Sequence, residues 1–153
     1  MGAIDDRLAE LGITIPDVAA PAGAYVPAIL VGTTVYTAGQ LPFVDGALPA
    51  TGKVGAEVDA EDAHGYARQA VLNALAAARS VIGDLDRVTQ IVKVTGFVAS
   101  DPAFTGQPGV INGASNVLGE IFGDAGRHAR SAVGVAVLPL DSPVEVEIIL
   151  EIE

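Results

Sequence analysis

The chain contains no cysteine and no tryptophan, and only two of its 153 residues are histidine. Without cysteine there is no disulfide framework, no thiol nucleophile and no thiolate metal site. The two histidines, His64 and His128, are far apart in the sequence, so a zinc site is not expected. We therefore predict that the protein holds no metal and that both histidines are surface residues.

Basic residues are also scarce. Eight Lys and Arg stand against nineteen Asp and Glu, which gives a net charge of −11 at neutral pH. A field of this sign repels phosphate backbones, which normally contribute much of the affinity for nucleic acids. Nucleic acid is therefore not an expected partner, and the acidity favours solubility.

Long hydrophobic runs are missing as well. Glycine and polar residues interrupt every apolar stretch before it reaches the 18 or so residues that cross a bilayer. The first residues lack the basic and apolar regions of a signal peptide. We expect a soluble, cytoplasmic protein with no membrane partner. The length favours a single domain over residues 1–153.

The pattern of apolar residues predicts seven main elements after an N-terminal extension (1–21) that contains a short helix at 5–11. They are a strand within 28–37, a second strand that ends at a turn at 45–46, a helix at 59–82, a strand at 88–98, a helix at 110–122, and strands at 130–137 and 144–152. The order β, β, α, β, α, β, β predicts an α+β fold, with two main helices packed on one face of a mixed sheet.

The strand at 130–137 carries a lone arginine on a face of small residues. Strand alternation puts Arg130, Ala132 and Gly134 on one side, and it puts Val133 and Val135 on the other. A small face beside a planar guanidinium suits close approach by another backbone and two-point capture of a carboxylate. We expect the valine side to pack against the helices.

The last strand alternates aliphatic residues with glutamates, so Glu145 is expected on the same non-helical face as Arg130. If the two terminal strands form a hairpin, Arg130 lies opposite Glu151 and roughly 20 Å from Glu145. Arg130 then either makes an exposed ion pair with Glu151 or belongs to a site between subunits. The apolar outer face, with Ala132, Gly134, Ala136 and Ile149, favours a second subunit over it.

These segments resemble the RidA/YjgF family, the reactive-intermediate deaminases, over roughly residues 22–153. The resemblance is carried by Tyr25, the stretch 36–42, Asn112, the stretch 129–133, Leu138-Pro139 and the stretch 144–147. It implies a chorismate-mutase-like α+β fold with a mixed sheet of the six-stranded type, assembled as a homotrimer with three clefts between subunits.

The resemblance also implies roles for individual residues. The arginine that matches Arg130 grips the carboxylate of a small 2-imino or 2-enamino acid, and the glutamate that matches Glu145 helps to place the attacking water. No cofactor is needed. The remaining positions that line the cleft are Tyr25, Ala38, Gly39, Asn112 and Ala132. Many members carry serine where this chain has Ala38 and cysteine where it has Ala132, and a glycine-rich insertion is expected around residues 105–109.

The function expected from this resemblance is hydrolysis of small imines or enamines to 2-keto acids and ammonia. A non-enzymatic protein that senses a small carboxylate or keto acid in the same cleft is the first alternative. An RNA-cleaving or translation-inhibiting role and a purely structural oligomer are the others. A covalent serine mechanism is not expected, because Ser115 lies in a helix pattern with no histidine nearby in sequence.

Overall fold

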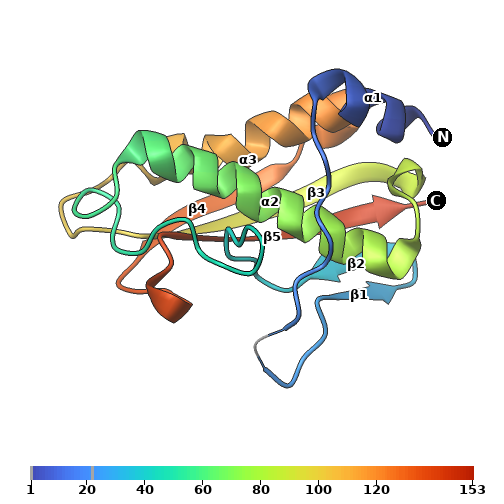
Figure 1. Ribbon diagram of the computed structural model, residues 1–153. Helices are drawn as coiled ribbons and strands as arrows, with labels where there is room; N and C mark the ends of the chain where they lie inside the picture. Colours follow the sequence, from blue (N-terminus) through green and yellow to red (C-terminus); the bar gives the residue numbers. More distant parts are fainter. Residues whose placement is uncertain (1, 22) are drawn as a thin grey trace.

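A five-stranded sheet supports the fold in the computed structural model, which describes residues 2–21 and 23–153 (Figure 1). Its strands run in the order β1-β2-β5-β3-β4. Only β3 and β4 are parallel, so the sheet is mixed, as expected. The expected six-stranded type is corrected to five strands within the described residues. Their bounds are Ala28–Val31, Thr34–Thr37, Val88–Ala99, Ala129–Val135 and Val144–Ile152 for β1 to β5.

The first two strands are a hairpin within the single run that was expected to form one strand. Gly32, with a φ of 62°, turns the chain between β1 and β2. The segment expected as the second strand contributes only an isolated bridge between Val44 and Ala47, around the predicted turn at 45–46. The prediction failed here because continuous β-branched residues do not reveal a turn that one glycine makes.

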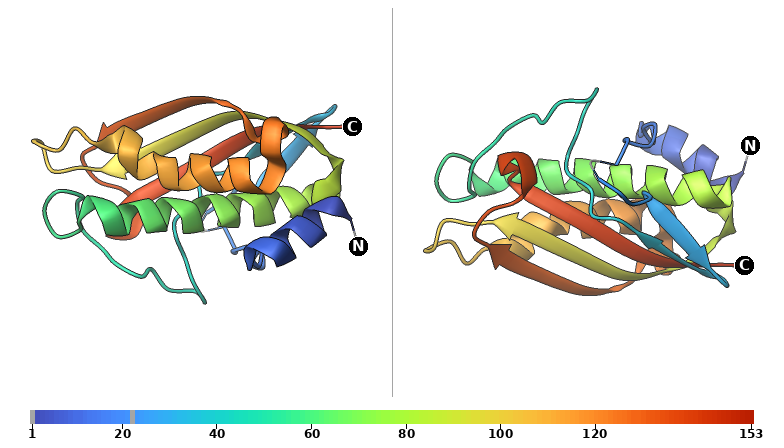
Figure 2. Two further views of the ribbon diagram at one scale, coloured as in Figure 1. Left: turned by 90° about the horizontal axis from the view of Figure 1, so that it is seen from above. Right: turned by 90° about the horizontal axis from the view of Figure 1, so that it is seen from below.

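Two long helices, α2 (Ala60–Ile82) and α3 (Gln107–Phe122), cover one face of the sheet, as predicted (Figure 2). The Asp59 side chain caps α2 by accepting the Asp62 N–H at 2.7 Å. The two helices touch at Gly113, where an added Cβ would lie 2.8 Å from the carbonyl carbon of His64. The buried core lies between them and the sheet.

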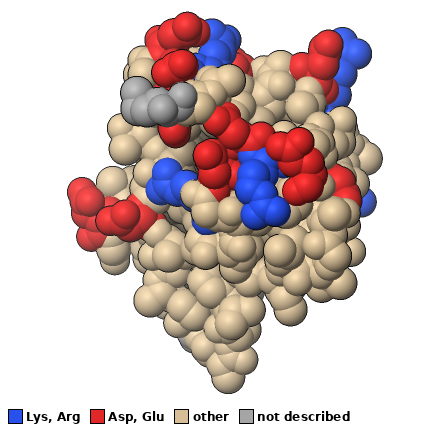
Figure 3. Space-filling model, turned by 90° about the vertical axis from the view of Figure 1, so that its right-hand side faces the viewer, with Lys and Arg blue, Asp and Glu red and all other residues tan. Residues whose placement is uncertain are grey.

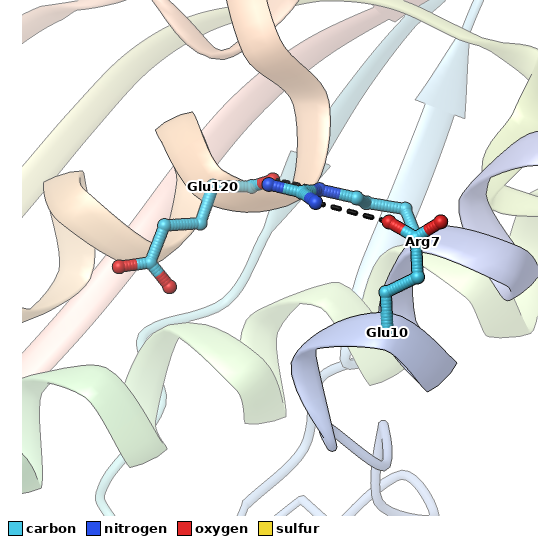
Figure 4. A network of polar contacts seen from close by, with 3 residues as sticks. All are labelled: Arg7, Glu10 and Glu120. Atoms are coloured by element: carbon cyan, nitrogen blue, oxygen red, sulfur yellow. Dashed lines mark hydrogen bonds and ion pairs between the residues drawn. The ribbon is translucent and has the colours of Figure 1, made fainter.

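The N-terminal extension contains the predicted short helix, α1 (Ala3–Leu11), which packs near the end of α3. Arg7 fastens it: its Nε donates to the Glu120 carbonyl at 2.8 Å, and its Nη1 pairs with Glu10 at 3.1 Å (Figure 4). Across the described ranges, no helix is long and apolar enough to cross a membrane.

The terminal strands do not form the expected hairpin. β4 pairs in parallel with one edge of β3, and β5 pairs antiparallel with the other edge. Arg130 is aligned with Val94 and Ile148 rather than with Glu151. The connection at 136–143 takes the chain across β3 and includes a short 3₁₀ turn, in which Leu140 and Asp141 have positive φ values.

The predicted orientation of β4 is also wrong. Arg130 and Ala132 face the helices, whereas Val133 lies on the outer face and is 43% exposed. The physical reason is the closeness of α3 to this strand: a Cβ on Gly134 would lie 2.8 Å from Nε2 of Gln107. The Gln107 side chain crowds this position and Arg130 on the same side hydrogen-bonds to α3, so the close approach expected of this face is made by the chain's own α3.

The outer face of the sheet is bare of helices and is apolar in its β1–β2 part, while β5 adds Glu145, Glu147 and Glu151 to it. Ile29, Tyr36 and Ile149 form a row across β1, β2 and β5, and Ile29 and Tyr36 are exposed. The sequence has no charged residue between positions 18 and 44. In the side view of Figure 3, the charged groups gather in the upper part and the lower part carries none. An exposed surface of this kind favours contact with another protein surface.

Candidate functional site

Arg130, near the start of β4, is held by three acceptors from α3. Its Nη1 donates to Asn112 Oδ1 at 2.8 Å and to Ser115 Oγ at 3.1 Å, and its Nη2 donates to the Pro108 carbonyl at 3.3 Å. The only ion pair among the described residues joins Arg7 and Glu10. Within that part of the chain, Arg130 therefore has no carboxylate partner, and the alternative pairing with Glu151 is wrong.

His128 extends this cluster on the side away from Asn112. Its Nε2 lies 2.8 Å from Ser115 Oγ, and its Nδ1 lies 2.7 Å from the Gly126 carbonyl. The ring is half-buried. The expectation of a simple surface histidine is therefore wrong, and a histidine does lie beside Ser115 in space although it is distant in sequence.

Glu145, on β5, forms a second group with the turn after β2. A Cβ on Gly39 would lie 2.7 Å from Cδ of Glu145, so a side chain at this position would displace the carboxylate. The backbone of Gln40 pairs with Val146, which holds the turn against β5. Burial of the carboxyl, and to a smaller extent the nearby Glu147 charge, raises the pKa of Glu145 above its ordinary value.

The two groups lie on opposite faces of the sheet. Arg130 shares the helix-facing side of Val94, whereas Glu145 is aligned with Phe97 and Val133 on the outer face. Glu145 is three residues farther along β3, about 10 Å, and two strands across, also about 10 Å. The expectation that Arg130 and Glu145 both face away from the helices is wrong. The two side chains are nevertheless too far apart within one chain to form a site, as expected.

The other predicted residues fall near one or the other group. Ala132 follows Arg130 on the helix-facing side and packs against the core. The Ala38 N–H donates to the Pro27 carbonyl at 2.8 Å, so the segment that carries Tyr25 runs beside the Ala38–Gly39 turn. Tyr25 is half exposed.

The sequence reasoning missed three contributors, Pro108, Ser115 and His128. Positions 108, 112 and 115 have the i, i+4, i+7 spacing of one helix face, so Asn112 could have pointed to the other two. His128 has the same strand parity as Arg130. Residues 105–109, expected as an insertion, include the first turn of α3, and proline near a helix N-terminus was the available signal.

No metal centre emerges from this geometry. Within residues 2–21 and 23–153, no three His, Cys, Asp or Glu side chains gather closely enough to hold a metal ion. The chemical resources of the site are one guanidinium, one half-buried carboxyl, and a chain of hydroxyl, imidazole and amide groups. These groups can bind an anion and accept a proton.

Comparisons with known proteins agree with this fold. The chain is 41% identical to Protein TCP17 of Trypanosoma cruzi over 152 residues, which cover 99% of this chain and 95% of that protein. The crystal structure of Atu1372, a protein of unknown function from Agrobacterium tumefaciens, superposes with a TM-score of 0.90 at 44% identity and covers 98% of this chain and 92% of that one.

A more distant solved structure is E. coli TdcF with bound serine, which has a TM-score of 0.66 at 27% identity over 92% of this chain and 96% of that one. The family model described as "YjgF/chorismate mutase-like, putative endoribonuclease" matches residues 5–152. This match confirms the resemblance found in the sequence and the α+β, chorismate-mutase-like fold. The chain belongs to the YjgF/chorismate mutase-like family.

Proposed function

We propose that this protein hydrolyses small 2-imino or 2-enamino acids to 2-keto acids and ammonia, in clefts between the subunits of a homotrimer. Arg130 binds the substrate carboxylate, and Glu145 of the neighbouring subunit orients and deprotonates the attacking water. Asn112 and Ala132 line the cleft beside Arg130, while Tyr25, Ala38 and Gly39 line it beside Glu145. No cofactor takes part.

The observation that carries this proposal is the way Arg130 is held. Its guanidinium has five N–H groups, and neutral acceptors engage both protons of Nη1 and one of Nη2. The remaining N–H groups belong to Nε and Nη2, two nitrogens on one edge of the guanidinium. That edge can bind a carboxylate with two parallel hydrogen bonds.

The raised pKa of Glu145 supports its role as a general base. A base works best when its pKa approaches the working pH, and burial moves this carboxyl in that direction. Water oxygen bonds to the electrophilic imine carbon while Glu145 takes a water proton. The C=N electron pair moves to the nitrogen, which gains one proton from solvent and a second from Glu145. The carbinolamine hydroxyl then gives its proton to solvent as the keto group forms, the C–N bond breaks, and the nitrogen leaves as ammonia.

The opposite orientations of Arg130 and Glu145 support a shared cleft. A site that contains both side chains requires the outer face of one subunit to meet the β4 edge of another. The apolar row on the outer face, Ile29, Tyr36 and Ile149, suits such burial. The relative TdcF is known with bound serine, a small molecule with a carboxylate, which fits the proposed class of ligand.

The direct test is to generate a 2-imino acid with an amino-acid oxidase and to follow its loss in the presence of the purified protein. We expect wild type to accelerate the loss and Arg130→Ala to abolish the acceleration. Arg130→Lys is the matched variant, because it keeps the charge but not the two-point geometry. If wild type and Arg130→Ala consume the imine at equal rates, the enzymatic proposal fails.

A sensor of small carboxylates in the same cleft is the second candidate. Ala38 and Ala132 favour it, since neither side chain can hydrogen-bond a reacting group. In that case 2-keto acids raise the melting temperature of wild type but not of Arg130→Ala, while imine loss stays at the uncatalysed rate. Cleavage of RNA, which the family description raises, is opposed by the net charge of −11.

A further inference from the structure

Ser115 and His128 form a hydrogen-bonded chain that ends on the Arg130 guanidinium. Gly126 O, His128, Ser115, Arg130 and Asn112 follow one another, and the successive separations of the polar atoms are 2.7, 2.8, 3.1 and 2.8 Å. The resemblance to the family assigned no role to Ser115 or to His128.

The direction of each hydrogen bond in the chain follows from its ends. A carbonyl oxygen only accepts, so the Gly126 carbonyl requires the proton of His128 on Nδ1. In the neutral ring, Nε2 then carries a lone pair and accepts the hydroxyl proton of Ser115. With its proton directed to His128, the Ser115 oxygen presents a lone pair to Arg130 Nη1.

The hydrogen bonds to Nη1 fix the plane of the Arg130 guanidinium. Arg130 Nη1 has two protons, and Ser115 takes one while Asn112 Oδ1 takes the other. Two acceptors on one nitrogen fix both the position of Nη1 and the rotation of the planar group. The edge formed by Nε and Nη2 is then directed away from α3 before any ligand arrives.

We propose that Ser115 and His128 are positioning residues, which hold the Arg130 guanidinium in the orientation that binds the substrate carboxylate. This inference rests on the proposed function of Arg130. Without the serine hydroxyl, Nη1 keeps a single acceptor from Asn112, and only the longer contact of Nη2 with the Pro108 carbonyl, at 3.3 Å, opposes rotation of the group about it. His128 acts through Ser115, because its two hydrogen bonds among the described residues go to Ser115 and to the Gly126 carbonyl and not to the guanidinium.

The test compares Ser115→Ala and His128→Asn with wild type, using the full chain and the oxidase-generated imine. His128→Asn keeps a donor near the Nδ1 position but has no acceptor near Nε2. We expect each variant to raise KM about tenfold with kcat nearly unchanged, since a carboxylate contact of this kind contributes to ground state and transition state alike. A variant that only unfolds part of the protein instead lowers kcat at constant KM.

Conservative replacements sharpen the comparison. Ser115→Thr keeps the hydroxyl and His128→Gln keeps an acceptor near Nε2, so both are expected to restore most of the lost affinity. Because His128 acts through Ser115, the double variant Ser115→Ala/His128→Asn is expected to lose no more than Ser115→Ala alone. Ser80→Ala, which removes a serine from α2, is the matched control with unchanged KM.

A second readout does not depend on turnover. Binding of 2-oxobutyrate and of its uncharged amide is measured for each variant, and Ser115→Ala is expected to lose the preference for the acid. In ¹⁵N NMR spectra, the two Nη signals of Arg130 are expected to be separate in wild type. They are expected to merge in Ser115→Ala as rotation about the guanidinium bonds becomes fast.

The outcomes separate the two proposals. If Arg130→Ala leaves acid binding unchanged, the proposed function itself fails. If Arg130→Ala abolishes binding but Ser115→Ala and His128→Asn keep the wild-type KM and acid preference, the positioning role is overturned and the function of Arg130 stands. Losses that add fully in the double variant also overturn it, because His128 then acts by a route other than Ser115.

Discussion

Arg130 and Glu145 point from opposite faces of one sheet, with β3 lying between their two strands. Arg130 is on the helix-facing side beside α3, and Glu145 is on the bare outer side against Gly39. A single subunit therefore cannot close a site around both groups. If the two act on one substrate, each site needs two copies of the chain, and this requirement leads to the first prediction.

Subunits that carry different single substitutions should together recover imine hydrolysis when they assemble with one another. Arg130→Ala supplies an intact Glu145, and Glu145→Gln supplies an intact Arg130. When the two variants are unfolded together and refolded as an equal mixture, about a quarter of the sites in random trimers receive both intact groups. We expect imine hydrolysis to recover to roughly that fraction of the wild-type rate.

Each variant refolded alone is the control and should stay inactive. A mixture of the two variants prepared without unfolding should also stay inactive for as long as the subunits do not exchange. If refolded mixtures show no recovery while hybrid assemblies are detected by mass, Arg130 and Glu145 do not meet across a subunit boundary.

Gly39 is expected to be intolerant of a methyl group for a reason specific to Glu145. An alanine Cβ at this position would lie 2.7 Å from the carboxyl carbon and 3.0 Å from Cγ of Glu145. Because these atoms belong to a flexible side chain, the carboxylate moves while the fold persists. A displacement of about 1 Å lowers kcat/KM roughly 100-fold.

The double variant Gly39→Ala/Glu145→Gln distinguishes this explanation from a general defect in the turn. If Gly39 acts only by leaving room for Glu145, the double variant is no slower than Glu145→Gln. Independent losses that multiply would show instead that the turn contributes its own contacts.

The raised pKa of Glu145 predicts that this carboxyl destabilises the folded protein near neutral pH. Its folded-state pKa lies above the unfolded value of about 4.5, so the stability gained from its neutral form is full below that unfolded value. That stability is lost as the pH rises through the folded-state pKa. Glu145→Gln, which stays neutral, should therefore be more stable than wild type at pH 7.

Urea unfolding at several pH values between 4 and 7.5 checks this prediction. The stability advantage of Glu145→Gln should shrink as the pH falls and should be smallest near pH 4. Glu147→Gln is the matched control: it removes the repulsion that is the smaller cause of the shift, so a smaller effect in the same direction is expected. A constant difference across the range would contradict the assignment.

Much of the fold could be predicted because its signals are local. The Asp59 cap and the 3.6-residue stripe fixed α2, and Gly83 ended it at the expected residue. No local signal in the sequence predicts the order of the strands in the sheet. The residues of β4 and β5 do not indicate that β3 lies between them. The short proline-bounded connection at 136–143 is compatible both with this arrangement and with a hairpin of β4 and β5.

The candidate site could be predicted only in part, for a related reason. The prediction placed Arg130 and Asn112 in one site, and the two side chains are hydrogen-bonded, but strand parity alone assigned Arg130 to the wrong face. Parity states which residues share a side; it does not state which side a helix covers. The deciding fact, that α3 lies over the side of β4 that carries Arg130 and Gly134, appears only when the packing is known.

The contact between α2 and α3 provides a prediction about stability that is independent of function. A methyl group on Gly113 would lie 2.8 Å from the carbonyl carbon of His64 and 3.3 Å from the Arg68 nitrogen, both backbone atoms. Backbone cannot move aside as a side chain can, so Gly113→Ala must push the helices apart. We expect a loss of about 3 kcal/mol in the free energy of unfolding.

Gly119, on the same helix, has nothing within 4 Å of an added Cβ. There, Gly119→Ala should gain about 0.5–1 kcal/mol through reduced backbone entropy in the unfolded chain. Urea denaturation of both variants checks the pair, and similar effects from the two substitutions would mean that helix propensity, rather than the contact with α2, governs Gly113.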